Sequence, residues 1–356
     1  MQRGTYVDPA AAKITLRQYA DSWLQAQTFD DATRDSQERR LRLHVYPVLG
    51  GKALGQLAAQ PSAIQAWVRG LARSAAADAA IARTARKGLA DTTARGVLTT
   101  LSMVMNAAVD DGLISRNPCA SRSVRAARPP DRKVVPWTAG QVSAVREALP
   151  ARYRATADVG RWLGLRQGEA FGLAVDDIDF LRREVHVCRQ VKRLGNALVF
   201  APPKGGKDRE VPLPESVGLR LSAHIASCPP VAVTLPWRTL AGPPVIAQLL
   251  FTTLQGRAIT RTPFTQKHWH PALRKAGIAV SRESGFHALR HYFASTVLYD
   301  GVDIRALAAY LGHHDPAFTL RIYAHLVPDA AERMRSVIDE AARVEADRPK
   351  TAQTAR

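Results

Sequence analysis

Apolar residues recur every three or four positions along the first third of the chain, the spacing of helices that bury one face. Leu16 and Trp23 share one such stripe, just after Thr15, a candidate N-cap. The stretches predicted to be helical are Thr15–Ala26, Thr33–Val45, Ser62–Leu71 and Thr92–Asp110. They predict a compact bundle with basic outer faces over residues 14–118, preceded by a flexible tail at residues 1–13.

The periodicity stops in two later places. Residues 74–87 are rich in Ala and Arg and are expected to form a loop with some helix. Residues 119–135 combine Ser, Ala, paired prolines and several cations, which predicts an interdomain linker. A capping box in Thr138–Gln141 opens the next helical region. A second domain is therefore expected over residues 136–345, and residues 346–356 are expected to be disordered.

The alternation typical of strands appears only over short stretches of the second domain. They are Phe180–Val191, Ala197–Pro202 and Arg209–Leu213, the last two joined by the turn Lys204–Asp208. Two glycines in this turn permit the positive φ that it requires. A helix near residues 217–225 and a proline-rich loop up to Leu250 follow. The predicted fold is mainly α: a helical bundle, then a mostly helical domain with a small antiparallel β-sheet.

The charge balance points to a polyanionic partner. The chain has 356 residues and a formal net charge of +19, from 50 Lys and Arg against 31 Asp and Glu. Nucleic acid is favoured over a membrane, because no stretch approaches the roughly 20 apolar residues of a membrane span. A merely soluble basic protein is the alternative. Three widely spaced cysteines and the lack of a signal-peptide pattern predict a reduced, cytoplasmic protein.

Candidate chemistry gathers in the stretch GFHALRHYFAST, residues 285–296. His287 and Arg290 lie three positions apart and face the same way on a helix. His313 and Tyr323 follow in a later segment. Tyrosine is an oxygen nucleophile, and arginines stabilise the charge of a phosphoryl transition state without a metal. The pattern favours a site that cuts phosphodiesters.

A metal site is the competing interpretation, because seven of the ten histidines lie between His268 and His325. His313 and His314 are adjacent and cannot easily point at one ion, and neither a helical HExxH motif nor a cysteine pair accompanies them. We therefore expect no metal.

Several separate motifs, in the family's order, resemble those of the tyrosine recombinase family, the phage-integrase type. The C-terminal signature comprises His287–His291, Leu311–His313 and Thr319–His325; the other motifs are Gly164–Glu169, like the family's first arginine motif, and Pro203–Leu213, like its lysine hairpin. The resemblance runs from about Ile14 to about Arg343. It implies a core-binding domain followed by a catalytic domain.

The resemblance also assigns roles to residues. Tyr323 would attack the scissile phosphate and form a 3′-phosphotyrosyl link, and Arg166 and Arg290 would bind the non-bridging oxygens. Lys204 would protonate the departing 5′ oxygen, with Lys207 as its rival. The roles of three further residues follow: His287 takes the phenol's proton or bonds a phosphate oxygen, His313 donates to the phosphate, and Glu169 anchors a guanidinium or is an ordinary surface pair.

Two positions depart from the family pattern. Ala288 stands where the family often has an acidic residue, and Gln167 where it often has a basic one. Neither change removes a catalytic group, so activity is expected. The phosphotyrosyl ester conserves the bond energy, so the resemblance implies no cofactor, neither ATP nor metal.

The implied partners are double-stranded DNA with specific recombination sites and further copies of the chain, as a homotetramer on DNA. An accessory DNA-bending or directionality factor is left open. An amphipathic helix at Pro328–Arg343 is expected to pack on its own domain or, as family precedent suggests, on a neighbour. Candidate DNA contacts, for which a solvated surface is the alternative, are Arg39, Arg42, Arg95, Arg122, Arg125 and Lys207.

Integration or excision of a phage or other mobile element is the favoured role. Resolution of chromosome dimers uses the same chemistry, and a type IB topoisomerase uses the same kind of tyrosine. A DNA-binding protein that no longer cuts is the alternative from a different class, and the full set of six catalytic side chains argues against it.

Overall fold

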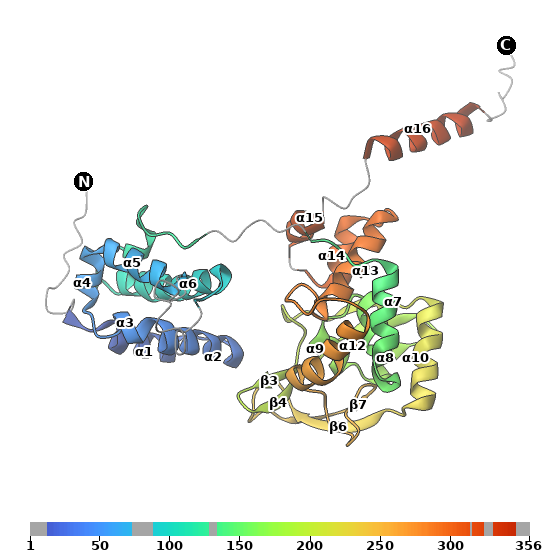
Figure 1. Cartoon of the computed structure of the whole chain (residues 1–356), viewed down its shortest axis with the longest axis horizontal. Coiled ribbons are helices and arrows are strands. Elements are labelled where there is room, and N and C mark those ends of the chain that lie inside the picture. The colour runs from blue at the N-terminus through green and yellow to red at the C-terminus, as the bar shows by residue number, and fades with distance from the viewer. Residues whose placement is uncertain (1–12, 73–87, 128–133, 314, 324–329, 347–356) are drawn as a thin grey trace, which may run out of the picture. The chain divides into compact units, whose positions relative to one another are not determined.

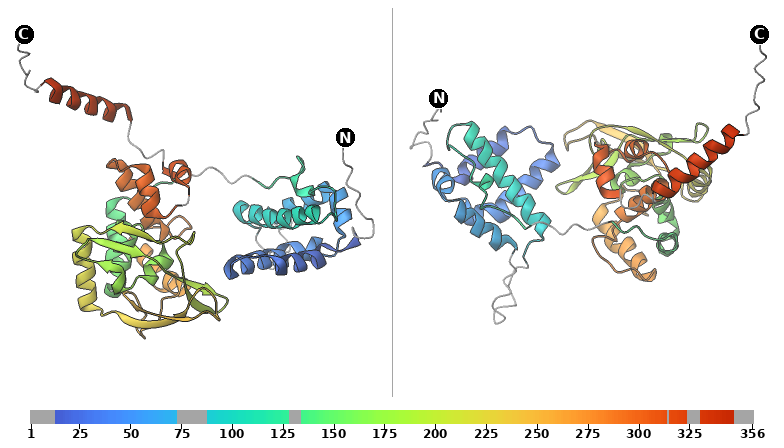
Figure 2. Two further views of the ribbon diagram at one scale, coloured as in Figure 1. Left: turned by 180° about the vertical axis from the view of Figure 1, so that it is seen from behind. Right: turned by 90° about the horizontal axis from the view of Figure 1, so that it is seen from above.

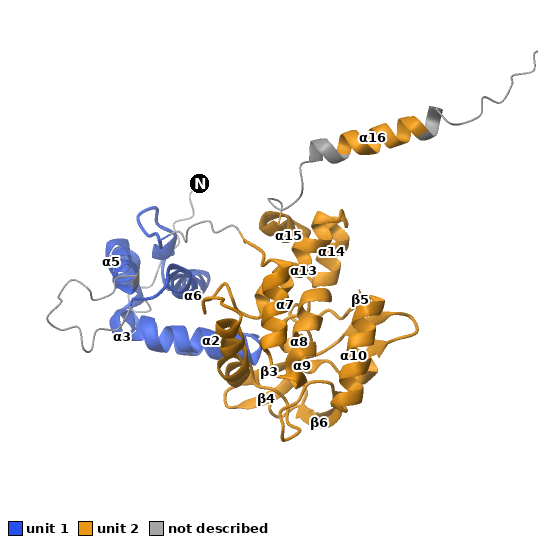
Figure 3. Ribbon diagram, turned by 45° about the vertical axis from the view of Figure 1, so that its right-hand side comes forward, with its two compact units in different colours: residues 1–132 blue, residues 133–356 orange. Residues whose placement is uncertain are grey.

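A computed structural model describes residues 13–72, 88–127, 134–313, 315–323 and 330–346 (Figure 1). The chain divides into two compact units, residues 1–132 and residues 133–356 (Figure 3). The predicted loop at residues 74–87 lies outside the described residues, as do the predicted tails apart from Lys13 and Ala346. Ala346 ends the helix Ala330–Ala346, so that helix extends one residue into the tail that was expected to be disordered.

Unit 1 is a bundle of helices that pack side by side (Figure 2). Its helices are α1 (Leu16–Ala26), α2 (Asp31–Arg40), α3 (Tyr46–Leu49), α4 (Leu54–Ala59), α5 (Pro61–Ala72) and α6 (Asp91–Asp110). Thr15 caps α1 through a capping box with Gln18. The core is formed by the apolar stripes that the spacing predicted, including Leu16, Trp23 and Leu101.

The region from Thr33 to Val45 is less regular than predicted. After α2 the chain forms a π-helical segment, Leu41–Val45, before α3 begins. Leu41 and Val45 are both buried, so the wider turn keeps both apolar side chains in the core. Pro47 lies in the first turn of α3, directly after the π-helical segment, and the chain stays helical through it.

The first residues of the sequence assigned to the linker pack on unit 1. Pro118–Ala120 form a 3₁₀ turn, and Cys119 and Val124 are buried in the core of the bundle. Asn117 caps the turn by accepting from Cys119 N at 2.8 Å.

Unit 2 consists mainly of helices. They are α7 (Ala139–Ala148), α8 (Ala151–Trp162), α9 (Gln167–Gly172), α10 (Glu215–Ser227), α11 (Arg261–Phe264), α12 (His270–Lys275), α13 (His287–Tyr299), α14 (Ile304–Leu311), α15 (Pro316–Tyr323) and α16 (Ala330–Ala346). Helices α8 and α13 approach closely at Gly160, where a Cβ would come within 2.9 Å of Leu289 Cδ1. This contact fixes the helix that carries the candidate chemistry against the core.

The strands of unit 2 form small antiparallel sheets. A three-stranded sheet contains β1 (Ile178–Asp179), β2 (Glu184–Val187) and β5 (Arg209–Pro212), and two hairpins contain β3 (Gln190–Leu194) with β4 (Ala197–Ala201) and β6 (Val231–Pro236) with β7 (Pro244–Leu249). The predicted fold class, mainly α with small antiparallel sheets, is confirmed. The detailed strand predictions need three corrections.

First, the predicted strand Phe180–Val191 is divided. A turn in which Arg183 has φ 58° precedes β2, and the chain leaves the ladder again after Val187. Second, β4 and β5, which flank the lysine turn, do not pair with each other. The tight turn at Gly195, with φ 55°, pairs β4 with β3, and β5 pairs with β2 in the register Val185↔Val211.

Third, the region predicted to be a proline-rich loop contains the β6–β7 hairpin. Pro236 and Pro244 stand opposite each other where the two strands meet the connecting turn, at the end of the ladder, where a missing N–H is tolerated. Val233 and Ala247 are paired and buried on its inner side.

Candidate active site

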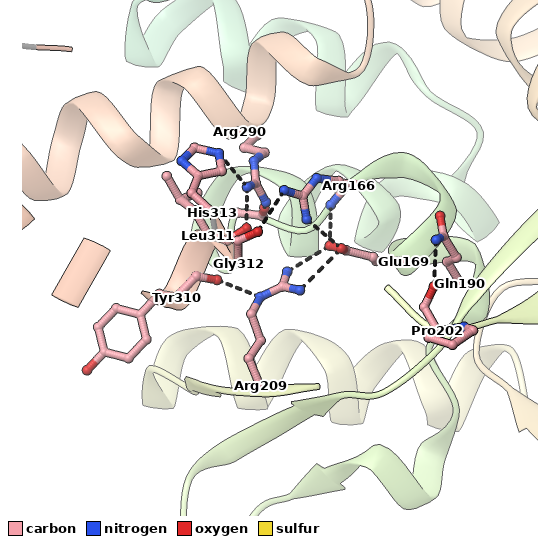
Figure 4. Close-up of polar contacts among 11 residues, drawn as sticks. Arg166, Glu169, Gln190, Pro202, Arg209, Arg290, Tyr310, Leu311, Gly312 and His313 are labelled. Carbon is pink, nitrogen blue, oxygen red and sulfur yellow. Dashed lines mark hydrogen bonds and ion pairs between the residues drawn. The ribbon is translucent and has the colours of Figure 1, made fainter. Parts of the chain in front are cut away.

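The end of α14 collects three arginines (Figure 4). Gly312, with φ 60°, ends the helix in the left-handed conformation and leaves its last carbonyls without helical partners. Three successive carbonyls then accept from guanidiniums: Tyr310 O from Arg209 Nε at 2.7 Å, Leu311 O from Arg290 Nη2, and Gly312 O from Arg166 Nη2 at 3.2 Å. Cations are stabilised at this end of a helix because its dipole is negative there.

Glu169 is the carboxylate among these arginines. Arg166 stands directly before α9, and Glu169 accepts from Arg166 Nη1 at 2.8 Å and from Arg166 N at 2.9 Å. It also accepts from Arg209 Nη2 at 2.7 Å. Burial alone would raise the pKa of Glu169, but the hydrogen bonds and charges of Arg209 and Arg166 outweigh it and lower the pKa to about 2. Glu169 is thus a buried bridge and not a surface pair.

Arg290 is almost completely buried, at 1% exposed. Its Nη1 donates to Gly164 O at 2.6 Å and its Nη2 to His313 Nε2 at 3.1 Å. Gly164 has φ 63°, and a Cβ there would lie 2.6 Å from the Phe293 ring, so the turn requires glycine. Nε of Arg290 is buried and has no hydrogen-bond partner in the described part of the chain. Burial, followed by the charge of Arg166, lowers the pKa of Arg290 to about 9.

His313 links α13 to α15. Because an arginine only donates, Nε2 of His313 accepts from Arg290, and Nδ1–H donates to Thr319 Oγ1 at 2.6 Å. Thr319 is fully buried on α15. Burial and then the charge of Arg290 lower the pKa of His313 to about 4, which keeps the imidazole neutral.

Tyr323 is the last residue of α15 and is 1% exposed. Its hydroxyl is hydrogen-bonded to Nδ1 of His291 at 2.6 Å. Burial raises the pKa of Tyr323 to about 12, against the opposing charge of Arg290. The phenol is therefore protonated, and no hydrogen bond joins it to Arg166, Arg290 or His313 among the described contacts.

His287 begins α13, one turn before His291, and the two rings stand edge to face with centroids 4.6 Å apart. His287 keeps an exposed edge, but loss of hydration, followed by the charges of His291 and Arg290, lowers its pKa. Of the predicted catalytic residues, the structure joins Arg166, Arg290 and His313 in one bonded network, and it holds His287 and Tyr323 against His291.

Comparison with known protein families identifies the family of this chain. The model of the Phage integrase family matches residues 140–329, which is more than half of the chain. The chain belongs to the phage integrase family. Its enzyme class is therefore that of the tyrosine recombinases, and its family activity is site-specific recombination.

The chain is similar in sequence to a phage integrase, and two solved structures have a similar fold. The integrase of Mycobacterium phage L5 is 29% identical over 318 residues, 88% of this chain and 76% of the relative. The Tn1549 transposon integrase, solved in complex with a circular intermediate DNA, has a TM-score of 0.74 at 21% identity, covering 91% of this chain and 99% of that one. A lambda integrase tetramer bound to a Holliday junction has a TM-score of 0.60 at 14% identity, covering 86% and 77%.

The two lysines predicted in this integrase-family chain lie apart from the arginine network. Lys204 and Lys207 are exposed in the turn between β4 and β5, where Gly205 and Gly206 have φ of 100° and 72°. Neither lysine has a hydrogen bond or ion pair among the described contacts. The turn is tied to the network through Arg209, the first residue of β5.

The other candidate DNA contacts of the integrase-family chain are exposed on unit 1. Arg39 pairs with Asp35 at 3.5 Å, and Arg95 donates to Ala127 O at 3.4 Å. Arg42, Arg122 and Arg125 are exposed as well.

Sequence reasoning missed Arg209 and His291. Arg209 shares its side of β5 with the buried Val211, so a charged residue occupies an inward-facing position of a strand. That alternation was a usable signal for a buried ion pair. His291 lies within the His287–His291 motif, but its contact with Tyr323 brings together residues 32 positions apart, which local spacing does not reveal.

The described residues offer neither a metal site nor a membrane span. They contain no group of three or more His, Cys, Asp or Glu side chains placed to hold a metal ion. Among the described helices, none has the length and apolar character needed to cross a membrane.

Proposed function

We propose that this chain is an integrase that cuts and rejoins DNA at specific sites through a 3′-phosphotyrosyl link at Tyr323, to integrate or excise a phage or other mobile element. The observation that carries the proposal is the arginine network. Arg166 and Arg209 bond the carboxylate of Glu169, and Arg290 lies within reach of its charge, so three guanidiniums surround a single carboxylate. This excess of positive charge suits an anion, and a DNA phosphate is the anion that the family chemistry supplies.

The unpartnered nitrogen of Arg290 supports the same conclusion. A buried donor without an acceptor is costly, and a phosphate oxygen would satisfy it. Arg166 is the more exposed of the two predicted phosphate ligands, since its side chain is 20% exposed. A phosphate reaching Arg166 would lie beside His313, which already contacts Arg290.

The proposed reaction forms one ester bond and breaks another. The Tyr323 oxygen bonds to phosphorus, the 5′ oxygen leaves and takes a proton, and a free 5′ hydroxyl of a partner strand later reverses the step. Lys204 is the proposed acid for the leaving oxygen, with Lys207 as the alternative, because both stand on a turn anchored to the network by Arg209. His287 is proposed to bond a phosphate oxygen, and His313 to support the phosphate beside Arg290.

The proposed partners are double-stranded DNA and further copies of this chain, four on each synapse. Support comes from the fold, which the chain shares with the lambda integrase tetramer bound to a Holliday junction, and from the net charge of +19. Helix α16 presents exposed Met334, Val337 and Ile338, spaced for one face, which suits docking on a neighbouring copy. Since the substrate is chromosomal or phage DNA, the proposed place of action is the cytoplasm.

A nicked suicide substrate tests the proposal. Duplexes tiled across the DNA that adjoins the gene would each carry a nick near the cleavage point, so that the cleaved fragment diffuses away. We expect a covalent protein–DNA adduct on the duplex that contains the recombination site, and none with Tyr323→Phe. A shifted band without any adduct would indicate a binding protein that does not cut. Relaxation of plasmids that lack a paired site would indicate a topoisomerase.

A further inference from the structure

The buried hydroxyl of Tyr323 requires a group to take its proton. A phenol whose pKa is raised to about 12 is a weak nucleophile until that proton leaves. Among the described contacts the hydroxyl has one partner, Nδ1 of His291 at 2.6 Å. The distance is that of a short hydrogen bond and lies within the range for direct proton transfer.

Helix geometry places this partner beside the arginine network. At about 100° per residue, Arg290 and His291 lie on either side of His287 on one face of α13. The helix therefore carries the phosphate-binding guanidinium at one edge of this face and the partner of Tyr323 at the other. A hydroxyl held on His291 lies next to the proposed phosphate site without being bonded to the arginines.

The surroundings hold the imidazole of His291 in place. Its ring stands against the ring of His287 at 4.6 Å and against that of Tyr323 at 5.6 Å. A base whose orientation is fixed in this way needs little reorganisation when it accepts a proton.

We propose that His291 accepts the phenolic proton of Tyr323 as the phenol attacks the DNA phosphate. This inference rests on the proposed function. In the step the O–H bond of Tyr323 breaks, the proton moves to Nδ1 of His291, the phenolic oxygen bonds to phosphorus, and the 5′ oxygen leaves with a proton from a separate acid. In the reverse step the His291 imidazolium returns its proton to the phenolic oxygen as that oxygen leaves phosphorus.

The charges around His291 suit this role. Loss of hydration and then the charge of Arg290 lower the pKa of His291 to about 4, so it is neutral and able to accept near neutral pH. The described titratable groups that face it are His287 and Arg290 on α13, Tyr323 on α15 and His313 after α14. Negative charge that develops on the attacked phosphate favours the imidazolium and so offsets these cations during the reaction.

The first test measures adduct formation by His291→Asn on a suicide substrate that the wild-type chain cleaves. Asparagine can bond the hydroxyl but cannot hold its proton, so we expect the single-turnover rate to fall on the order of 100-fold. Tyr292→Phe, a change at the next position of α13, should retain the wild-type rate. Mobility shifts and thermal melting of each variant show whether binding and folding are preserved.

Two chemical rescues separate proton acceptance from a structural role. Fluorinated tyrosines at position 323 lower the phenol pKa, so they should restore much of the rate lost in His291→Asn. A 5′-bridging phosphorothiolate, whose sulfur leaves without a proton, should restore Lys204→Ala and leave the defect of His291→Asn unchanged. If His291→Asn proves unstable, the same fluorinated series in His291→Gln provides the test.

The outcomes are distinct. A wild-type rate in His291→Asn, or a faster rate because the hydroxyl has been released, would overturn the inference while the adduct still supports the proposed function. Rescue of His291→Asn by the phosphorothiolate would overturn it as well, because it would place His291 on the leaving-group side. Failure of the wild-type chain to form any adduct would overturn the proposed function and the inference together.

Discussion

Glu169 allows three guanidiniums to lie close together in the interior of unit 2. Its carboxylate is completely buried and bonds Arg166 and Arg209, whose side chains are 20% and 8% exposed. Such a group is costly to remove, because the two cations would remain without a counter-charge. Arg166, the proposed phosphate ligand, is therefore oriented by a residue that need not touch the substrate.

Glu169→Gln should lower the free energy of unfolding by about 3 kcal/mol near neutral pH. Its folded pKa of about 2 is below the ordinary value near 4.3, so the carboxylate stabilises the fold above that ordinary value. This stabilisation is lost as the pH falls from about 5 towards 2. Urea unfolding across this range should show the wild-type and variant curves converging in acid.

Glu147→Gln is the matched control for this prediction. Glu147 also pairs with arginines, but its side chain is 57% exposed. An exposed pair contributes less than about 1 kcal/mol. Equal losses in the two variants would contradict the account of Glu169 as a buried bridge.

The relative placement of two residues could be predicted where it depends only on their spacing within one helix. His287 and Arg290 share a helix face, and both were identified from positions three apart. Arg209 and His291 were missed because their partners lie far along the chain: Tyr310 is 101 residues from Arg209, and Tyr323 is 32 from His291. Helical periodicity gives the face of a residue, whereas the tertiary packing decides what that face meets.

Among the elements, the end of α14 has the greatest effect on the site. Gly312 supplies the left-handed cap and accepts from Arg166, while Arg209 packs directly over it. A Cβ at Gly312 would lie 3.2 Å from Arg209 Nη1 and 3.3 Å from its Cδ. The turn therefore couples backbone conformation to the position of two guanidiniums.

Gly312→Ala should lower stability by about 1–2 kcal/mol through its positive φ and should also slow adduct formation, because Arg209 must move. Gly277→Ala is the control: Gly277 has a similar φ of 71°, but a Cβ there would meet nothing within 4 Å. We expect a similar loss of melting temperature in both variants and a slower reaction only in Gly312→Ala. A reaction slowed equally in both would show that backbone strain alone is responsible.

The elements themselves were predicted unequally well. The N-cap predicted at Thr15 and the capping box predicted at Thr138 are both present, because each is a local pattern of side chain and backbone. Strand pairing was harder to predict, since the lysine turn joins β4 and β5 without pairing them. The β6–β7 hairpin was missed because its prolines suggested a loop, although they lie where the ladder ends.

At the scale of the whole molecule, helix α16 presents an apolar face. The sequence predicted an amphipathic helix over Pro328–Arg343, and the structure has one at Ala330–Ala346. Met334, Val337 and Ile338 are 59%, 61% and 58% exposed. Exposed apolar side chains on one helical face favour burial against a partner, and the proposed tetramer supplies a neighbouring copy.

A double variant, Val337→Asp with Ile338→Asp, tests this docking. Two carboxylates on the face would have to be desolvated in the interface, so assembly of several copies on one DNA should weaken at least about 10-fold. Binding of a single copy to a half-site should be unchanged, because the arginine network and unit 1 are not altered. Mobility shifts on half-site and full-site DNA distinguish the two effects.

Asp339→Asn with Glu340→Gln, at exposed neighbouring positions of α16, is the control and should assemble normally. Normal assembly of the aspartate variant would show that α16 does not join the copies.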